Sequence, residues 1–148
     1  PSSAASDVYK RQREAVWAYS DAHALVKPVQ AAYTEAKKHV VTAYYRIQSL
    51  TDMKHSLAQG FPYVFGFTVY DYFLSDVMAS SGILQMPGPD ETVQGGHAVL
   101  AVGYDDAKKM IKVRNSWGDT WGLGGYFWMP YDYISDPNLA DDMWTIRK

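Results

Sequence analysis

The sequence has 148 residues, a formal net charge of −2 and no cysteine. Apolar residues make up 47% and charged residues 20%, a balance that favours one folded domain and excludes a disordered chain or a strongly basic, nucleic-acid-binding one. No apolar run reaches the roughly 18 residues of a membrane-spanning helix. We therefore expect no membrane as a partner, and the net charge gives no reason to expect nucleic acid. Without cysteine, this chain carries no disulfide, no zinc–thiolate site and no cysteine nucleophile of its own.

Residues 1–12 call for an explanation of their own. The string SSAASDVYKRQ, which follows Pro1, resembles a transposase-based sequencing adaptor translated in frame. We therefore interpret residues 1–12 as a disordered adaptor scar and expect the natural sequence to begin at Arg13. The alternative is an ordinary polar N-terminal arm. On the adaptor interpretation, the gene is truncated and whatever preceded Arg13 is missing.

The first natural segments are mixed. Residues 13–27 look like an extended, partly packed segment, and good helix formers at 29–39 predict a short helix. The β-branched and aromatic residues of 40–47 predict a strand. Ser49 is a suitable cap for a helix that ends at Gly60.

The middle of the chain predicts one buried strand and a loop. The strand is FPYVFGFTV at 61–69, with Gly66 in its middle, where glycine often allows close approach of a ligand or another chain. A short helix is expected at 70–82, and proline and glycine predict a loop at 86–96.

The remainder predicts a meander of strands, at 97–105, 109–117, 124–134 and 142–148. Together with the short helices, this pattern predicts an α+β fold built mainly on antiparallel sheet. Strands 97–103 and 110–115 should pair as a hairpin.

That hairpin would bring together two polar side chains. His97 follows two glycines at the start of an apolar strand, and Asn115 ends the next strand, so the two should approach within roughly 2.7–3.2 Å. A carboxamide oxygen can accept the imidazole N–H, fix its tautomer and leave the other ring nitrogen free to exchange a proton with a thiol. Taken alone, a histidine in a glycine-rich turn can equally be structural.

Two sequence blocks carry a family resemblance. GGHAVLAVGYD followed by KVRNSWGDTWGLGGYFWM resembles the histidine and asparagine blocks of the papain family of cysteine peptidases, in order and in spacing. Upstream, SLTDMKHSLAQGFPYVFGFTVYDYF resembles bacterial-type members. The resemblance covers residues 13–148 and implies the C-terminal, β-rich half of a papain-like fold.

The resemblance implies a role for each site residue. His97 is the general base, Asn115 orients it, Trp117 shields their hydrogen bond from water, and Gly118 is structural. Gly66 and Gly96 stand at the wall of the second specificity pocket, where they leave room for a bulky apolar side chain of a peptide or protein substrate. No cofactor or metal is implied.

The cysteine and the oxyanion-hole glutamine of the family belong to its N-terminal half, and neither is found here. The expected partner is therefore the missing N-terminal half of the same domain. We expect an exposed apolar face around Trp117, which that half would cover. We interpret the chain as a truncated, inactive fragment of a peptidase. The alternatives are a natural pseudo-peptidase that binds peptides or proteins, and an unrelated β-rich structural protein.

Other polar residues receive plainer interpretations. The remaining histidines, His23, His39 and His55, lack the spacing of metal ligands. The acidic pairs 105–106 and 141–142 are expected to form solvated turns, without a calcium role.

Overall fold

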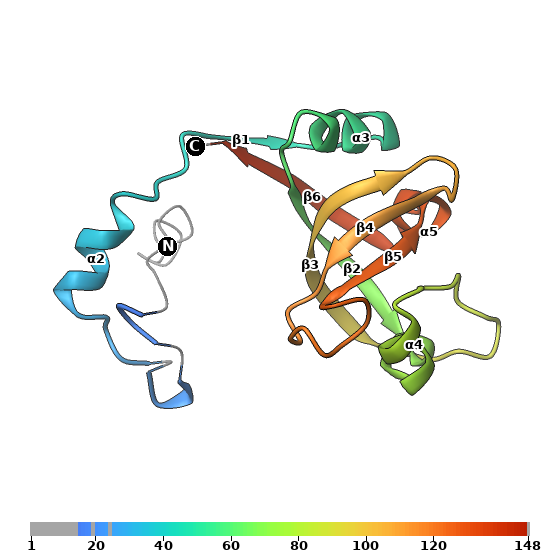
Figure 1. Ribbon diagram of the computed structural model, residues 1–148, viewed down its shortest axis with the longest axis horizontal. Coiled ribbons are helices and arrows are strands. Elements are labelled where there is room, and N and C mark those ends of the chain that lie inside the picture. The colour runs from blue at the N-terminus through green and yellow to red at the C-terminus, as the bar shows by residue number, and fades with distance from the viewer. Residues whose placement is uncertain (1–14, 19, 24, 148) are drawn as a thin grey trace. The chain divides into compact units, whose positions relative to one another are not determined.

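The computed structural model describes residues 15–18, 20–23 and 25–147. The adaptor-like interpretation of residues 1–12 falls outside these described residues. The chain divides into two compact units, residues 1–44 with 147–148 and residues 45–146 (Figure 1).

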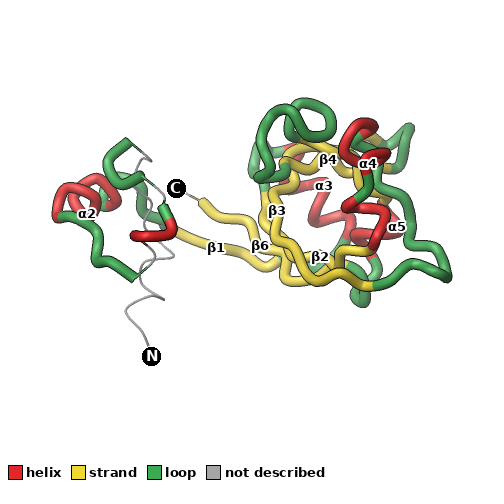
Figure 2. The backbone as a smooth tube through the Cα atoms, turned by 90° about the horizontal axis from the view of Figure 1, so that it is seen from below, coloured by secondary structure: helices red, strands yellow, loops and turns green. Residues whose placement is uncertain are grey.

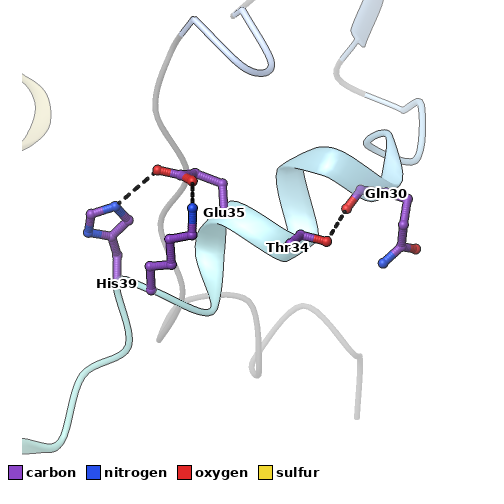
Figure 3. Close-up of polar contacts among 5 residues, drawn as sticks. Gln30, Thr34, Glu35 and His39 are labelled. Carbon is purple, nitrogen blue, oxygen red and sulfur yellow. Dashed lines mark hydrogen bonds and ion pairs between the residues drawn. The ribbon is translucent and has the colours of Figure 1, made fainter.

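The first unit contains the 3-10 helix η1 (Asp21–His23) and the helix α2 (Gln30–Ala36), which confirms the core of the helix predicted at 29–39. The helix α2 buries Ala32 and Ala36 on one side. Polar side chains of α2 form local hydrogen bonds (Figure 3). Thr34 Oγ1 donates to the Gln30 carbonyl, and the Glu35 carboxylate accepts from Lys38 Nζ at 2.8 Å. These are the local contacts of a surface helix.

A six-stranded sheet with the order β1-β6-β2-β3-β4-β5 dominates the structure. Four neighbouring pairs are antiparallel: β6 with β2, β2 with β3, β3 with β4 and β4 with β5. Figure 2 shows the strands following a curved path. The strands are β1 (Ala43–Arg46), β2 (Tyr63–Tyr70), β3 (Val93–Asp105), β4 (Met110–Arg114), β5 (Tyr126–Pro130) and β6 (Ala140–Arg147).

Short helices connect the strands. They are α3 (Leu50–Ala58), the 3-10 helix η2 (Asp71–Leu74), α4 (Asp76–Ser81) and α5 (Tyr131–Ser135). Ser49 caps α3, as predicted, because its hydroxyl accepts the backbone N–H of Asp52 at 3.1 Å. Ser75 caps α4 in the same way, through the N–H of Met78.

The core is organised around β2, whose alternating side chains Tyr63, Phe65, Phe67 and Val69 are buried. Burying each such side chain contributes roughly 1.5–3 kcal/mol of hydrophobic stabilisation. The opposite phase of β2 stays accessible, which is the pattern of a strand with one face on the core. Further core residues come from the neighbouring elements: Phe73, Met78, Val99, Ala101, Ile111, Val113, Phe127, Met129, Tyr133 and Ile134.

Several predicted boundaries were wrong. The strand expected at 124–134 ends at Pro130, because the chain turns into α5 there and the N–H of Tyr131 donates to the carbonyl of Lys109. The strand expected at 40–47 is confined to β1. The strand β3 begins at Val93, inside the expected loop 86–96, and β6 begins at Ala140 rather than at residue 142.

Candidate active site

The hydrogen bond predicted between His97 and Asn115 is present, with 2.8 Å between Nε2 and Oδ1. His97 lies on β3, opposite Phe67 of β2. Asn115 follows the last residue of β4, and the β3–β4 register, with Leu100 opposite Arg114, brings the two side chains together. Because the amide oxygen can only accept, the imidazole carries its proton on Nε2, and Nδ1 has no hydrogen-bond partner within the described residues.

The backbone holds Asn115 firmly. Its side chain is buried, and its Oδ1 also accepts the N–H of Ser116 at 2.8 Å. With two donors aimed at one atom, this atom must be the amide oxygen rather than the nitrogen. The Asn115 backbone N–H donates to the carbonyl of Gly125 at 2.9 Å, while the amide Nδ2 is buried without a partner in the part of the chain described.

Two glycines shape the loop between Asn115 and β5. Gly118, predicted to be structural, has φ of +90°, and Gly125 has φ of +85°. A Cβ at Gly125 would lie 3.0 Å from the carbonyl oxygen of Gly118, so a side chain there would crowd this oxygen as well as strain the backbone. The carbonyl of Gly125 accepts the backbone N–H of Asn115, so the conformation that glycine allows here also positions the backbone of Asn115.

Aromatic side chains surround the imidazole. The Trp117 ring stacks on His97 with centroids 5.1 Å apart and 25° between planes, although Trp117 remains 41% exposed. Phe67 and Phe73 lie on other sides of the imidazole, with centroids at 5.8 and 6.1 Å. Sequence reasoning missed both phenylalanines as site residues; the signal for Phe67 was its core-facing phase in the strand 61–69. These rings give the imidazole an aromatic environment.

A cavity of about 430 Å³ adjoins His97. Gly66 and Gly96, both predicted as substrate-binding, line it; at Gly96 a Cβ would meet only the Phe67 carbonyl oxygen, at 4.0 Å. Asp141 closes the space above Gly66, since its Oδ1 would lie 3.4 Å from a Cβ there. The turn expected at 141–142 was therefore wrong: both residues belong to β6, and Asp141 lines the cavity.

The other three histidines make contacts of their own or are exposed. His23 stacks on Trp17, and His39 approaches Glu35 at 3.4 Å (Figure 3). His55 is exposed on α3. No group of three metal-ligating side chains occurs among the described residues.

The acidic pair at 105–106 fastens the β3–β4 hairpin. Hydrogen bonds from Lys54 and Tyr131 lower the pKa of Asp106, and the backbone N–H of Lys108 lowers the pKa of Asp105. Lys54 lies on α3 and Tyr131 on α5, so Asp106 ties both helices to the hairpin. Within residues 15–18, 20–23 and 25–147, none of the helices could span a lipid bilayer.

Comparisons with known proteins identify the family and the fold. The family model described as papain family cysteine protease matches residues 3–145, a range that includes most of the adaptor-like segment. The solved structure of xylellain, a cysteine protease from Xylella fastidiosa, is 38% identical with a TM-score of 0.85, over 94% of this chain and 57% of that one.

Curated sequences point the same way. An uncharacterized peptidase C1-like protein of Acanthamoeba polyphaga mimivirus is 44% identical over 141 residues, which are 89% of this chain and 45% of that protein. Cathepsin B-like CP3 of Giardia intestinalis is 43% identical over 75 residues, 49% of this chain and 23% of its own length. This chain thus spans less than half the length of these two relatives. It belongs to the papain family of cysteine proteases.

Proposed function

We propose that this chain supplies the general base and the orienting amide of a papain-like cysteine peptidase. The observation that carries the proposal is the 2.8 Å hydrogen bond from His97 Nε2 to Asn115 Oδ1, which leaves Nδ1 available for a proton. The thiol would come from a cysteine-bearing part of the domain, because this sequence has none. The coverage of 57% of xylellain supports such a further part.

Each residue then has a step in peptide hydrolysis. His97 Nδ1 accepts the thiol proton, and the thiolate attacks the scissile carbonyl carbon. His97 returns that proton to the leaving amine, which departs as the carbon–nitrogen bond breaks and leaves a thioester. His97 next takes a proton from water, whose oxygen attacks the thioester and releases the acid and the thiol. Asn115 keeps the ring aligned, and Trp117 shields their hydrogen bond.

The cavity beside His97 would receive the substrate side chain next to the cleaved residue. Gly66 and Gly96 leave room for a bulky apolar group, as the sequence suggests. Asp141 adds a carboxylate that has no hydrogen bond or ion pair within the described residues. We therefore infer that a long basic side chain, whose methylenes fill the cavity and whose cation reaches Asp141, fits better than a purely apolar one.

The missing nucleophile favours a second candidate function for the chain by itself. Without cysteine it can bind a peptide in the cavity and leave the peptide intact, as a pseudo-peptidase binding module would.

The test joins this chain to the cysteine-bearing part of a papain-family relative and measures hydrolysis of a fluorogenic peptide. We expect activity that thiol alkylation abolishes. His97→Ala should lower it by at least the roughly 10²–10⁴-fold that general acid–base catalysis contributes. Asn115→Ala should cost less, because base and nucleophile both remain.

His55→Ala is the matched control, since this histidine is exposed and outside the site. It should leave the activity unchanged. Equal activity of the His97→Ala and His55→Ala proteins would refute the base assignment. Peptide binding without hydrolysis, even when the cysteine-bearing part is attached and folded, would select the binding-module alternative.

A further inference from the structure

The strand β6 carries one extra residue opposite β2. Val64 pairs with Trp144 and Gly66 pairs with Asp141, so two steps along β2 correspond to three along β6. The backbone of Asp142 has φ of +56°, in the left-handed region that only glycine, asparagine and aspartate visit readily. The irregularity is therefore a β-bulge at Asp142.

The bulge keeps the side chains of β6 in phase with the core. Ala140, Met143 and Thr145 are all buried, while Asp141 and Asp142 are exposed in succession. In a regular strand, where side chains alternate, Ala140 and Met143 would lie on opposite faces. The extra residue at Asp142 resolves this conflict.

An indole clamp holds the bulge. The Trp144 Nε1–H donates to Asp142 Oδ1 at 2.7 Å. The Arg46 guanidinium lies over the Trp144 ring, 5.8 Å from its centroid. The carboxylate of Asp142 thus both suits the left-handed backbone and ties it to the next residue but one.

The two adjacent aspartates therefore separate. Asp141 lines both the cavity beside His97 and the neighbouring cavity of about 440 Å³, whereas Asp142 lines only the second, together with Arg46. Opposite Asp141 stands Gly66, which has no side chain to hold that carboxylate in place. The Asp141 Oδ1 lies 3.4 Å from where a Cβ would stand at Gly66, so the carboxylate occupies the space that this glycine leaves.

We propose that Asp142 is a positioning residue for substrate recognition: its left-handed backbone and its bond to Trp144 aim the Asp141 carboxylate into the cavity beside His97. The inference rests on the proposed function of that cavity. It assigns to Asp142 a role in substrate preference without contact with the substrate.

The test titrates the 148-residue chain, labelled with ¹⁵N, with N-acetyl-arginine amide and with the uncharged N-acetyl-norleucine amide. We expect the amide resonances of Gly66 and Gly96 to shift, at lower concentrations for the arginine probe. The indole Nε1–H resonance of Trp144 reports the clamp directly in the same spectra.

The variants separate backbone, clamp and charge. Asp142→Asn keeps an acceptor and tolerates the left-handed backbone, so it should preserve the indole resonance and the arginine affinity. Asp142→Gly keeps the bulge without the clamp, and Trp144→Phe removes the donor. Each should weaken arginine binding about three- to tenfold, through lost preorganisation, and leave norleucine binding unchanged.

Asp141→Asn distinguishes the positioning role of Asp142 from the assignment of the cavity to a basic side chain. If Asp141→Asn loses the arginine preference while Asp142→Gly and Trp144→Phe retain it, the positioning role is overturned and the cavity assignment stands. If the wild-type chain does not prefer arginine, or Asp141→Asn preserves the preference, the cavity assignment falls and the positioning role with it.

Discussion

At the scale of single residues, Tyr63 and Tyr133 are two core tyrosines that differ in what their hydroxyl groups contact. Burial raises the pKa of both, so both remain neutral. The Tyr133 hydroxyl donates to the Thr68 carbonyl at 2.6 Å, whereas that of Tyr63 is buried without a partner among the described residues. We expect Tyr133→Phe to lower the free energy of unfolding by about 1 kcal/mol and Tyr63→Phe to leave it unchanged or raise it slightly. Urea denaturation of the two variants, each the control for the other, measures this; equal losses would contradict it.

At the scale of elements, Asp71 of η2 anchors the start of β3. Its Oδ2 accepts the backbone N–H and the hydroxyl of Thr92, both at 2.7 Å. The backbone hydrogen bond from Thr92 is the main cause that lowers the pKa of Asp71. A lowered pKa means that the anchor stabilises the fold above the ordinary aspartate pKa and is lost as the pH falls through the lowered value. Hydrogen exchange should therefore show protection of the Thr92 amide falling in acid, and Asp71→Asn should reduce it at neutral pH. Asp90→Asn, in the loop that leads to Thr92, is the control. Equal protection of the Thr92 amide in the Asp71→Asn and Asp90→Asn proteins would contradict the role of Asp71 as an anchor.

At the scale of the whole molecule, exposed apolar side chains cross one face of the sheet. Val64 of β2 is 46% exposed, its cross-strand neighbours are Leu100 and Trp144, and Ile146 lies two residues further along β6 at 54%. We expect this face, in addition to the surroundings of Trp117, to pack against the cysteine-bearing part, and the isolated chain to self-associate through it. A Val64→Lys, Ile146→Lys double variant should lower the weight-average mass in sedimentation experiments. Val77→Lys is the control, because Val77 is 60% exposed on α4, and it should leave the mass unchanged. A monomeric wild-type chain would contradict the expectation.

The sequence was sufficient for features that depend on local pattern. The capping of α3 by Ser49 and the His97–Asn115 hydrogen bond follow from residue type and from one hairpin. The strand at 142–148 was predicted, but the start of β6 and its register could not be, because β6 pairs with β2, far away in the sequence. Asp141 was therefore expected in a solvated turn. The helix α5 was missed because an apolar, aromatic run after Pro130 suits a buried strand as well as a buried helical turn.

The separate origins of the base and of the cavity's carboxylate have an evolutionary consequence. His97 and Asn115 come from β3 and the end of β4, while Asp141 comes from β6, on the other side of β2. On the function proposed above, a substitution in β6 would alter substrate preference without disturbing the hydrogen bond between His97 and Asn115. On the same proposal, duplicated genes would diverge in substrate preference through one exposed segment of β6 and keep the same chemistry at His97.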